Sequence, residues 1–326
     1  MGLRIATFNL ENLDVGGGNA PSIAQRIAIM RPQLRRISAD ILCLQEVNSQ
    51  KDSAGNRELK ALDDLLSGTD YAAFHRETNL TEHNILYSER NLITLSRFPI
   101  LETHIIRPSD GPRMSYQMST ADPPDTDADK IRWERPMLYT QIDIGNGKRL
   151  HLVNVHFKSK LATNIPGQKE DYAWKSVSAW AEGSFISSMK RVGQALQTRM
   201  LIDKLFDDFG EDAPIAVVGD FNADIEEVSM KAIIGPVEET GNPAHGPRRM
   251  IPCENNIPDT SRYSLIHLGK GAMLDHVFAS RGLVQYFAGA EIHNEALPDE
   301  SGSFRTDAKF PESDHAPVIA QFNING

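Results

Sequence analysis

The sequence predicts a protein of the α/β or α+β class, in which helices cover the faces of β-sheets. Two observations lead to this class. Helical and extended segments are mixed along the whole chain of 326 residues, and several extended segments are almost wholly apolar, as in "DILCLQEV" and "APIAVVG". A strand with so few polar residues is covered on both faces, because an exposed face would show polar side chains at every second position.

Eight extended segments account for the expected strands. They are rich in the β-branched, aliphatic and aromatic residues that fit a pleated sheet. Two of them, residues 137–144 and 148–157, are separated by a short Gly/Asn connection, which predicts a β-hairpin. The expected strands are residues 3–9, 40–47, 91–100, 137–144, 148–157, 213–222, 273–280 and 316–324.

Helices are expected in three places. Residues 21–38 have a helical pattern, but Pro32 lacks a backbone donor and predicts a break or a restart there. Residues 57–68 form an amphipathic helix that a glycine closes. Residues 188–208 carry apolar side chains near helical spacing, so we expect a helix here as well.

Three long stretches show neither pattern: residues 107–134, 159–187 and 236–262. Loops of this length in a compact domain are usually functional or mobile. Trp174 and Trp180 lie in the second stretch. With Tyr172 they could stack on nucleic-acid bases, although aromatic residues at spacings of two and six more often pack a lid.

The charge balance limits how the protein could hold a partner. With 34 Lys+Arg against 44 Asp+Glu the net charge is −10, which argues against binding nucleic acid by bulk positive charge. A nuclease remains compatible with this charge, because a metal ion offsets an acidic site locally. Cys43 and Cys253 do not form a zinc-binding pattern. No export signal or membrane span is visible, so we expect a cytoplasmic protein without membrane contacts or an implied protein partner.

Several apolar runs end abruptly in a polar or charged residue. Asn9 follows "IATF", Glu46 follows "ILCLQ", His156 follows "LVNV" and Asp220 follows "IAVVG". Ligands of sheet proteins often bind at the carboxyl ends of strands. If these ends lie parallel, they gather an amide, two acids and an imidazole in one cleft.

Two Asp-His pairs complete the set, namely Asp275 with His276 and Asp314 with His315. An Asp beside a His can orient the imidazole and stabilise its charged form. His276 follows Asp275 by one position on a strand and faces the other side of the sheet, so we interpret it as structural. The acids supply hard oxygen ligands, which suit Mg²⁺, Mn²⁺ or Ca²⁺ rather than Zn²⁺.

The remaining candidates favour phosphate chemistry. Asn222 could hydrogen-bond an attacking water or a non-bridging oxygen, or it could with Asp220 cap a helix that begins near residue 224. His156 and His315 could donate to phosphate or move protons. Arg135 could grip a phosphate through its fork of donors. Together these residues predict metal-assisted hydrolysis of a phosphate ester.

These motifs resemble those of the endonuclease/exonuclease/phosphatase superfamily, which includes deoxyribonuclease I and abasic-site endonucleases. Asn9, "LQEV", "GDFNA", "LDH" and "SDHAPV" occur in the order that the superfamily shows. The resemblance implies a four-layered sandwich in which two mixed β-sheets pack face to face with helices outside. Because it covers almost the whole chain, it also implies one domain over residues 1–326, although length alone suggests about two.

The resemblance implies roles for the central residues. Glu46 is similar to the principal metal ligand, with Asn9 and Asp314 beside it. Asp220 resembles the acid that activates the attacking water or handles the leaving-group proton, and Asn222 resembles its positioning partner.

Other residues are similar to the deoxyribonuclease I branch of the superfamily. His315 resembles the histidine that contacts the scissile phosphate and is held by Asp275, and His156 resembles the second catalytic histidine of this branch. The segments "YSERNL" and "ERP" imply three further candidates. They are Glu89 as the partner of His156, Tyr87 as a substrate contact and Arg135 as the arginine that grips phosphate.

The expected activity is therefore that of a Mg²⁺- or Mn²⁺-dependent phosphodiesterase. The favoured substrate is DNA or RNA, cut with low sequence specificity. One alternative is a phosphatase or phospholipase-type hydrolase that acts on a small or lipid phosphate ester. A second alternative is a non-catalytic binding module on the same fold. The stretch at 159–187 is longer than the matching loop of deoxyribonuclease I, and the specificity-bearing loops match no branch.

Overall fold

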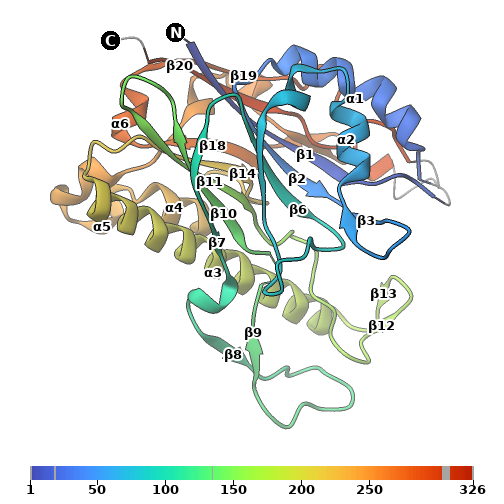
Figure 1. Cartoon of the computed structure of the whole chain (residues 1–326). Coiled ribbons are helices and arrows are strands. Elements are labelled where there is room, and N and C mark those ends of the chain that lie inside the picture. Colours follow the sequence, from blue (N-terminus) through green and yellow to red (C-terminus); the bar gives the residue numbers. More distant parts are fainter. Residues whose placement is uncertain (1, 18–19, 134, 303–308, 325–326) are drawn as a thin grey trace.

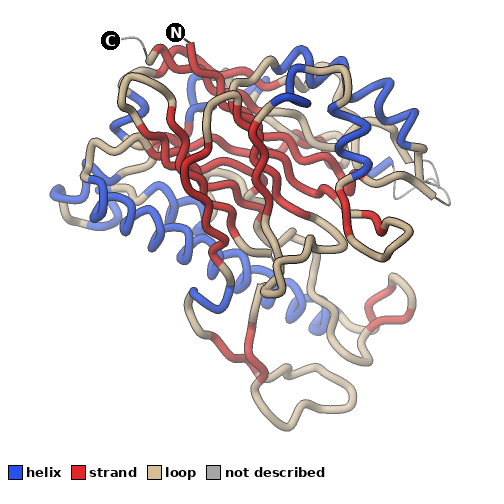
Figure 2. Tube along the Cα trace, viewed as in Figure 1, coloured by secondary structure: helices blue, strands red, loops and turns tan. Residues whose placement is uncertain are grey.

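Two six-stranded β-sheets pack face to face, and helices cover the outer face of each sheet (Figure 1). The computed structural model describes residues 2–17, 20–133, 135–302 and 309–324. The first sheet has the order β19-β20-β1-β2-β6-β5 and the second has the order β15-β18-β14-β11-β10-β7. The expected fold class, a four-layered sandwich of two mixed sheets with helices outside, is confirmed (Figure 2).

The elements have the following bounds. The first sheet contains β1 (Gly2–Leu13), β2 (Ile41–Val47), β5 (His75–Thr78), β6 (Asn91–Ser96), β19 (Phe287–Ile292) and β20 (Val318–Asn323). The second contains β7 (Ile100–Ile106), β10 (Met137–Asp143), β11 (Arg149–His156), β14 (Ile215–Asp220), β15 (Ile251–Pro252) and β18 (Asp275–Ala279). The helices are α1 (Ile23–Ile37), α2 (Lys60–Leu66), α3 (Val177–Phe209), α4 (Val228–Ile234), α5 (Val237–Thr240) and α6 (Arg281–Val284).

Short two-stranded sheets accompany the two large sheets. They are β3 (Gln50–Lys51) with β4 (Arg57–Glu58), β8 (Met114–Tyr116) with β9 (Asp129–Ile131), β12 (Lys169–Glu170) with β13 (Ala173–Trp174), and β16 (Leu265–His267) with β17 (Lys270–Ala272).

The alternation of side chains along the central strands separates three apolar layers. Ile5 of β1 and Val218 of β14 lie in the core between the two sheets. Phe8 of β1 faces the other way and packs with α1 and α2. Val217 of β14 packs in the same manner in the layer that contains α3 and α4. Both sheets are therefore covered on both faces, as their apolar sequences require.

The strand directions bring particular residues to one edge of the sandwich. In the first sheet β1 and β2 run parallel, and in the second sheet β11 and β14 run parallel. The strands β20 and β18 run antiparallel to β1 and β14, so they begin where β1 and β14 approach their ends. The pairing of Asp220 with Asp275 and of Thr7 with Val318 shows this alignment. Four strand ends and two strand starts therefore share one edge.

A chain of buried polar side chains joins the two sheets just beneath this edge. Thr7 Oγ1 donates to Gln45 Oε1 at 3.1 Å, and Gln45 Nε2 donates to Asn154 Oδ1 at 2.8 Å. Asn154 Nδ2 in turn donates to the carbonyl of Ile93 at 3.0 Å. Thr7 and Gln45 belong to the first sheet and Asn154 to the second. We call Thr7, Gln45 and Asn154 the inter-sheet bridge.

Three expectations about single elements are corrected. Pro32 does not break its helix, because Met30, Leu34 and Ile37 are buried on either side of it and hold α1 continuous. The segment 91–100 is not one strand, since the chain turns after Ser96 and enters β7 at Ile100. The helix expected at 188–208 begins earlier, at Val177, where the Ser176 side chain caps it by accepting from the backbone of Ala179.

Part of the expected loop at 159–187 is therefore helix. The remainder, together with the stretch 107–134, projects from the sandwich around β8, β9, β12 and β13 (Figure 1). Ala121, Ile131, Ile165 and Ile186 form a small apolar cluster inside this projection, and Trp174 packs against it. Trp174 thus packs against a surface cluster, whereas Trp180 is half exposed and Tyr172 is almost fully exposed. Among the described residues no helix combines the length and the apolar character needed to span a bilayer.

Candidate active site

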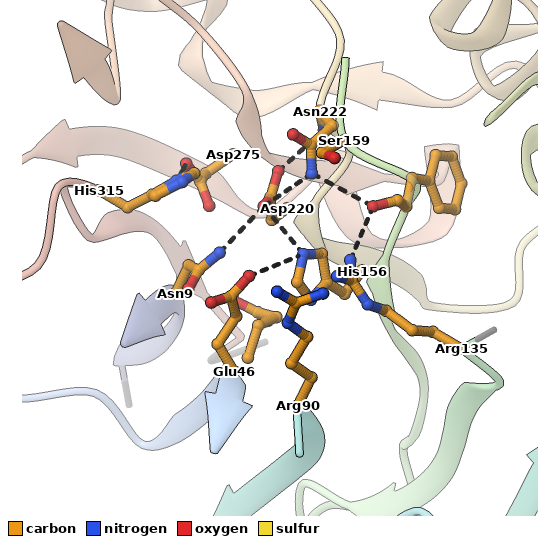
Figure 3. A network of polar contacts seen from close by, with 12 residues as sticks. Asn9, Glu46, Arg90, Arg135, His156, Ser159, Asp220, Asn222, Asp275 and His315 are labelled. Carbon is orange, nitrogen blue, oxygen red and sulfur yellow. Dashed lines mark hydrogen bonds and ion pairs between the residues drawn. The ribbon is translucent and has the colours of Figure 1, made fainter. Parts of the chain in front are cut away.

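The shared edge of the two sheets gathers polar side chains that are far apart in the sequence (Figure 3). The first sheet contributes Asn9 near the end of β1 and Glu46 near the end of β2, and the second contributes His156 and Asp220 at the ends of β11 and β14. Asp275 opens β18, and His315 lies shortly before β20. The structure thus places these six predicted residues together.

Asp220 is the centre of this network. Its Oδ2 accepts from Asn9 Nδ2 and from Asn222 Nδ2, each at 3.0 Å, and its Oδ1 accepts from the Asn222 backbone at 2.8 Å. Burial opposes its ionisation, but the charge of His315 and the hydrogen bond from His156 outweigh burial and hold the pKa of Asp220 well below its usual range. Asp220 is therefore a fixed anion with a defined orientation.

The turn after β14 explains why this strand ends in "GDFN". Gly219 has φ +145°, and a Cβ at this position would lie 2.0 Å from the carbonyl oxygen of Val155. Asn222 has φ 51°, a left-handed conformation that asparagine adopts more readily than most residues. Its side chain also donates to the carbonyl of Phe157 at 3.2 Å. Asn222 therefore holds the turn and orients the Asp220 carboxylate, which is more than a helix cap would do.

The two histidines of the site differ in protonation. His315 Nδ1 lies 2.7 Å from Asp275 Oδ2. Burial lowers the pKa of His315, but the charges of Asp275 and Asp220 outweigh it and raise the pKa well above the ordinary value. His315 is therefore an imidazolium at neutral pH.

His156 is held neutral instead. Its Nε2 lies 3.3 Å from Asp220 Oδ2 and 3.4 Å from Glu46 Oε1. Complete burial, helped by the charge of Arg135, lowers the pKa of His156 below its ordinary value. A neutral ring in this position carries its proton on Nε2 and donates it to the carboxylates. Its Nδ1 has no hydrogen-bond partner among the described residues.

The acids of the site are incompletely compensated. Asp275 Oδ1 and Asp314 Oδ1 are buried without a hydrogen-bond partner in the described part of the chain. Burial and the negative charge of Glu46 raise the pKa of Asp314 to about 6, despite the nearby His315. Ligand atoms of Asp220, Asp275 and His315 lie within 4.8 Å of one another, so this group could hold a metal ion. The edge therefore has the acidic character that a divalent cation would compensate.

Two acids show how the first sheet shapes this edge. Glu46 has φ 58°, and its Oε2 accepts from the backbone of Asn12 at 3.0 Å. Burial opposes its ionisation, but His156, Arg135 and Arg90 lie around it and lower its pKa. Glu11 also lies at this edge, although no sequence pattern pointed to it. Burial and the charge of Asp314 raise the pKa of Glu11 to about 7, and its Oε2 accepts from the Asp314 backbone at 3.1 Å.

The expected phosphate-binding and supporting residues lie beside this network. Arg135 donates to the carbonyl of Phe157 at 3.0 Å and lines a pocket that Tyr87 and Glu89 share. No hydrogen bond joins Glu89 to His156 among the described residues: His156 Nε2 lies beside Glu46 and Asp220, and its Nδ1 has no hydrogen-bond partner. The structure thus places Glu89 and Tyr87 next to Arg135 and not in the network of Asp220.

His276 has the structural role that its strand position predicts. It is fully buried, with Nδ1 2.5 Å from Glu254 Oε1 and Nε2 2.9 Å from the carbonyl oxygen of Ala223. Both partners accept, so both ring nitrogens must donate and the ring is charged. Burial lowers the pKa of His276, but Glu254 outweighs it and the net shift is upward. His276 therefore anchors the residue that follows Asn222.

Replacement of His276 by alanine is expected to reduce the free energy of unfolding by about 3–5 kcal/mol, because it leaves Glu254 buried without its partner. Urea titration followed by circular dichroism measures this loss. The double variant His276→Ala/Glu254→Gln removes the stranded charge and should recover part of the stability. If the single and double variants were equally stable, the buried charge of Glu254 would not lower the free energy of unfolding when His276 is absent.

Fold and site together define a class of protein, the metal-dependent phosphoesterases built on a four-layered sandwich. The chain belongs to the Endonuclease/Exonuclease/phosphatase family, whose sequence model matches residues 6–315. The expected superfamily is thereby confirmed. No curated protein matches the chain in sequence.

Solved structures of low sequence identity share the fold. A humanised TDP2 of D. rerio has a TM-score of 0.57 and 14% identity, with 99% of each chain covered. An endonuclease/exonuclease/phosphatase from Beutenbergia cavernae has a TM-score of 0.59 and 14% identity over 100% of this chain and 72% of that one. The 3′ phosphatase NExo from Neisseria, bound to a product DNA hairpin, has a TM-score of 0.55 and 16% identity over 98% of this chain and 99% of that one.

Proposed function

We propose that this protein is a Mg²⁺- or Mn²⁺-dependent phosphodiesterase that cleaves DNA or RNA with little sequence preference, and that residues 1–326 act as one catalytic domain. The observation that carries the proposal is the convergence of Asp220, His315 and His156 beside buried oxygens of Asp275 and Asp314 that have no hydrogen-bond partner among the described residues. The NExo structure with a DNA hairpin supports nucleic acid as the substrate class.

The donor set fits a hard divalent cation. Glu46 and Asp314 lie close enough for the charge of one to raise the pKa of the other, and Asp314 Oδ1 has no hydrogen-bond partner among the described residues. Asn9 Nδ2 is committed to Asp220, while Asn9 Oδ1 accepts one bond from Glu11 and keeps a lone pair. We therefore assign the cation to Glu46 and Asp314, with Asn9 Oδ1 beside them.

The trio of Asp220, Asp275 and His315 is the weaker choice for this cation. His315 Nδ1 and Asp275 Oδ2 lie 2.7 Å apart and are engaged with each other. Burial lowers the pKa of His315, but the charges of Asp275 and Asp220 outweigh burial and raise it, which favours the protonated ring that has no lone pair for a metal. Asp220 already accepts from Asn9 and Asn222. When bound at Glu46 and Asp314, the cation supplies positive charge that offsets the charge developing on the phosphoryl oxygens.

The protein side chains then position the attacking water and bind the phosphoryl oxygens. Asp220 accepts a hydrogen bond from the attacking water and so orients it or takes its proton, and Asn222 keeps the carboxylate in place. His315 donates from Nε2 to a phosphoryl oxygen while Asp275 holds its other nitrogen. His156 donates to Asp220 and Glu46 and fixes their separation. Arg135 adds charge-assisted hydrogen bonds to the phosphate.

Removal of divalent cations tests this proposal. Supercoiled plasmid should be nicked in Mg²⁺ or Mn²⁺, and excess EDTA should abolish nicking, because the uncompensated acids would then repel the phosphate. Added Mg²⁺ should restore the rate. Turnover of a lipid or small phosphate ester with none of DNA or RNA would favour the alternative hydrolase. Tight ligand binding without turnover of any phosphate ester would favour the non-catalytic module.

A further inference from the structure

A pocket of about 400 Å³ opens beside the catalytic network. Arg90, Arg135 and Lys158 line it, and Glu89 is the acid among its lining residues. This concentration of positive charge is unexpected in a chain of net charge −10. Because long-range charge would repel a polyanion from this protein, local cations are the means by which it could hold one. We call this cavity the cationic pocket.

The cationic pocket is continuous with the catalytic network. Arg135 lines the pocket, and its charge also acts on Glu46 and on His156. Arg90 Nε donates to Asn12 Oδ1 at 3.4 Å, and the backbone of Asn12 donates to Glu46 at 3.0 Å. Figure 3 shows Arg90 and Arg135 on the side of the network where Glu46 and His156 lie.

The backbone of Arg90 is tied to the fold, whereas its side chain is exposed to solvent. Its backbone N–H donates to Asn48 Oδ1 at 3.0 Å, which fixes the start of β6. Its side chain is exposed, and no ion pair of Arg90 occurs among the described residues. An arginine fork offers paired donors that match phosphate oxygens. Of the pocket's cations, Arg90 is therefore the one whose donors are best placed for a ligand.

We propose that the cationic pocket binds a second phosphate of the substrate, next to the one that is hydrolysed, and that Arg90 selects for it. The inference rests on the proposed phosphodiesterase function and extends it to substrates with at least two phosphates. Two sources share this chemistry, the flanking phosphate of a polynucleotide and the second phosphate of a dinucleoside diphosphate. Tyr87 and Pro136, which also line the pocket, offer apolar surface for a sugar or a base.

The test compares Arg90→Gln with Arg281→Gln. Arg281 lies in α6, which follows the far end of β18, and its exposed ion pair with Asp212 at 3.9 Å makes it a matched loss of charge away from the pocket. The substrates are a thymidine dinucleotide with and without a terminal phosphate, and a dinucleoside diphosphate. Arg90→Gln should lower the preference for the terminally phosphorylated dinucleotide, as a ratio of kcat/KM values, by about 10- to 100-fold. If Arg90→Gln lowered kcat/KM only for the dinucleoside diphosphate, the second phosphate in the pocket would be that of the diphosphate and not the flanking phosphate of a polynucleotide.

An unchanged ratio with equal losses on every substrate would overturn the inference, since Arg90 would then serve the scissile phosphate. Binding separates this failure from a failure of the proposed function. Without any turnover, calorimetry in Ca²⁺ should still show that wild-type protein binds thymidine 3′,5′-bisphosphate about tenfold or more tighter than thymidine 5′-monophosphate. Arg90→Gln should lose that difference and Arg281→Gln should keep it. Equal affinities for the two nucleotides in wild-type protein would refute the second phosphate site.

Discussion

Asp220→Asn is expected to lower kcat by about 10²–10⁴-fold, because the neutral amide keeps only one accepting oxygen for the donors of Asn9, Asn222 and the attacking water and loses the negative charge. Its NH2 group would also face other donors, either Asn9 Nδ2 and Asn222 Nδ2 or the Asn222 backbone, all of which donate to Asp220 in the structure. The measurement is the initial rate of plasmid nicking at saturating Mg²⁺.

Asp212→Asn is the matched control for this loss. Asp212 makes an ion pair at 3.9 Å with Arg281, and its side chain is 85% exposed, so the same chemical change there should leave the rate within about twofold. Thermal melts of both variants show whether the fold is retained. A folded Asp220→Asn protein that keeps more than a tenth of the wild-type kcat would remove Asp220 from the mechanism.

His315→Gln is expected to lower kcat by about 10²–10³-fold, because the charged donor that faces the phosphoryl oxygens is lost. The loss should fall on kcat more than on KM, since charge on those oxygens grows toward the transition state. Steady-state kinetics on a dinucleotide separate the two constants. His276→Ala is a poor control here because it disturbs the neighbouring turn, whereas the exposed His104→Gln changes a histidine outside the network.

The His315–Asp275 pair is also expected to determine how kcat depends on pH. The folded protein raises the pKa of His315, so its cationic form is present below that raised value and is lost as the pH rises through it. Asp275→Asn removes the charge that raises this pKa, and the alkaline limb of the kcat profile should move to lower pH by about one unit or more. An alkaline limb that stays in place would assign it to another group.

The sequence predicted which residues meet at the shared edge of the two sheets better than it predicted the elements around them. Asn9, Glu46, His156 and Asp220 could be found because each interrupts an apolar run at the point where a ligand of a sheet protein often binds. That they meet depends on β1 with β2 and β11 with β14 running parallel. Strand direction is set by pairing between distant segments, so the motif order of the family, and not local pattern, supported that expectation.

Other features left no local signal. Arg90 and Glu11 have φ values of 60° and 45°, so irregular turns direct them, and no periodic pattern marks such positions. The strand β19 has the sequence "FAGAEI", whose small residues and glycine resemble a loop until β20 pairs with it. Pro32 was misjudged because a local penalty was weighed without the burial of Met30 and Leu34. In each case contacts distant in sequence outweighed local preference.

The inter-sheet bridge has a consequence for how this molecule can diversify. Apolar side chains tolerate small sliding of one layer over another, whereas the amides of Gln45 and Asn154 find their acceptors at a single alignment. Glu46 follows Gln45 directly, and His156 comes two positions after Asn154 on the same strand. The alignment of the two bridge amides therefore also fixes the positions of Glu46 and His156. The relative placement of Glu46 and His156 is therefore set by the interior and not by the periphery. Insertions such as the projection around β8 and β12 can lengthen, shorten or change sequence, and so acquire new ligand preferences. Glu46 and His156 keep their relative placement when they do.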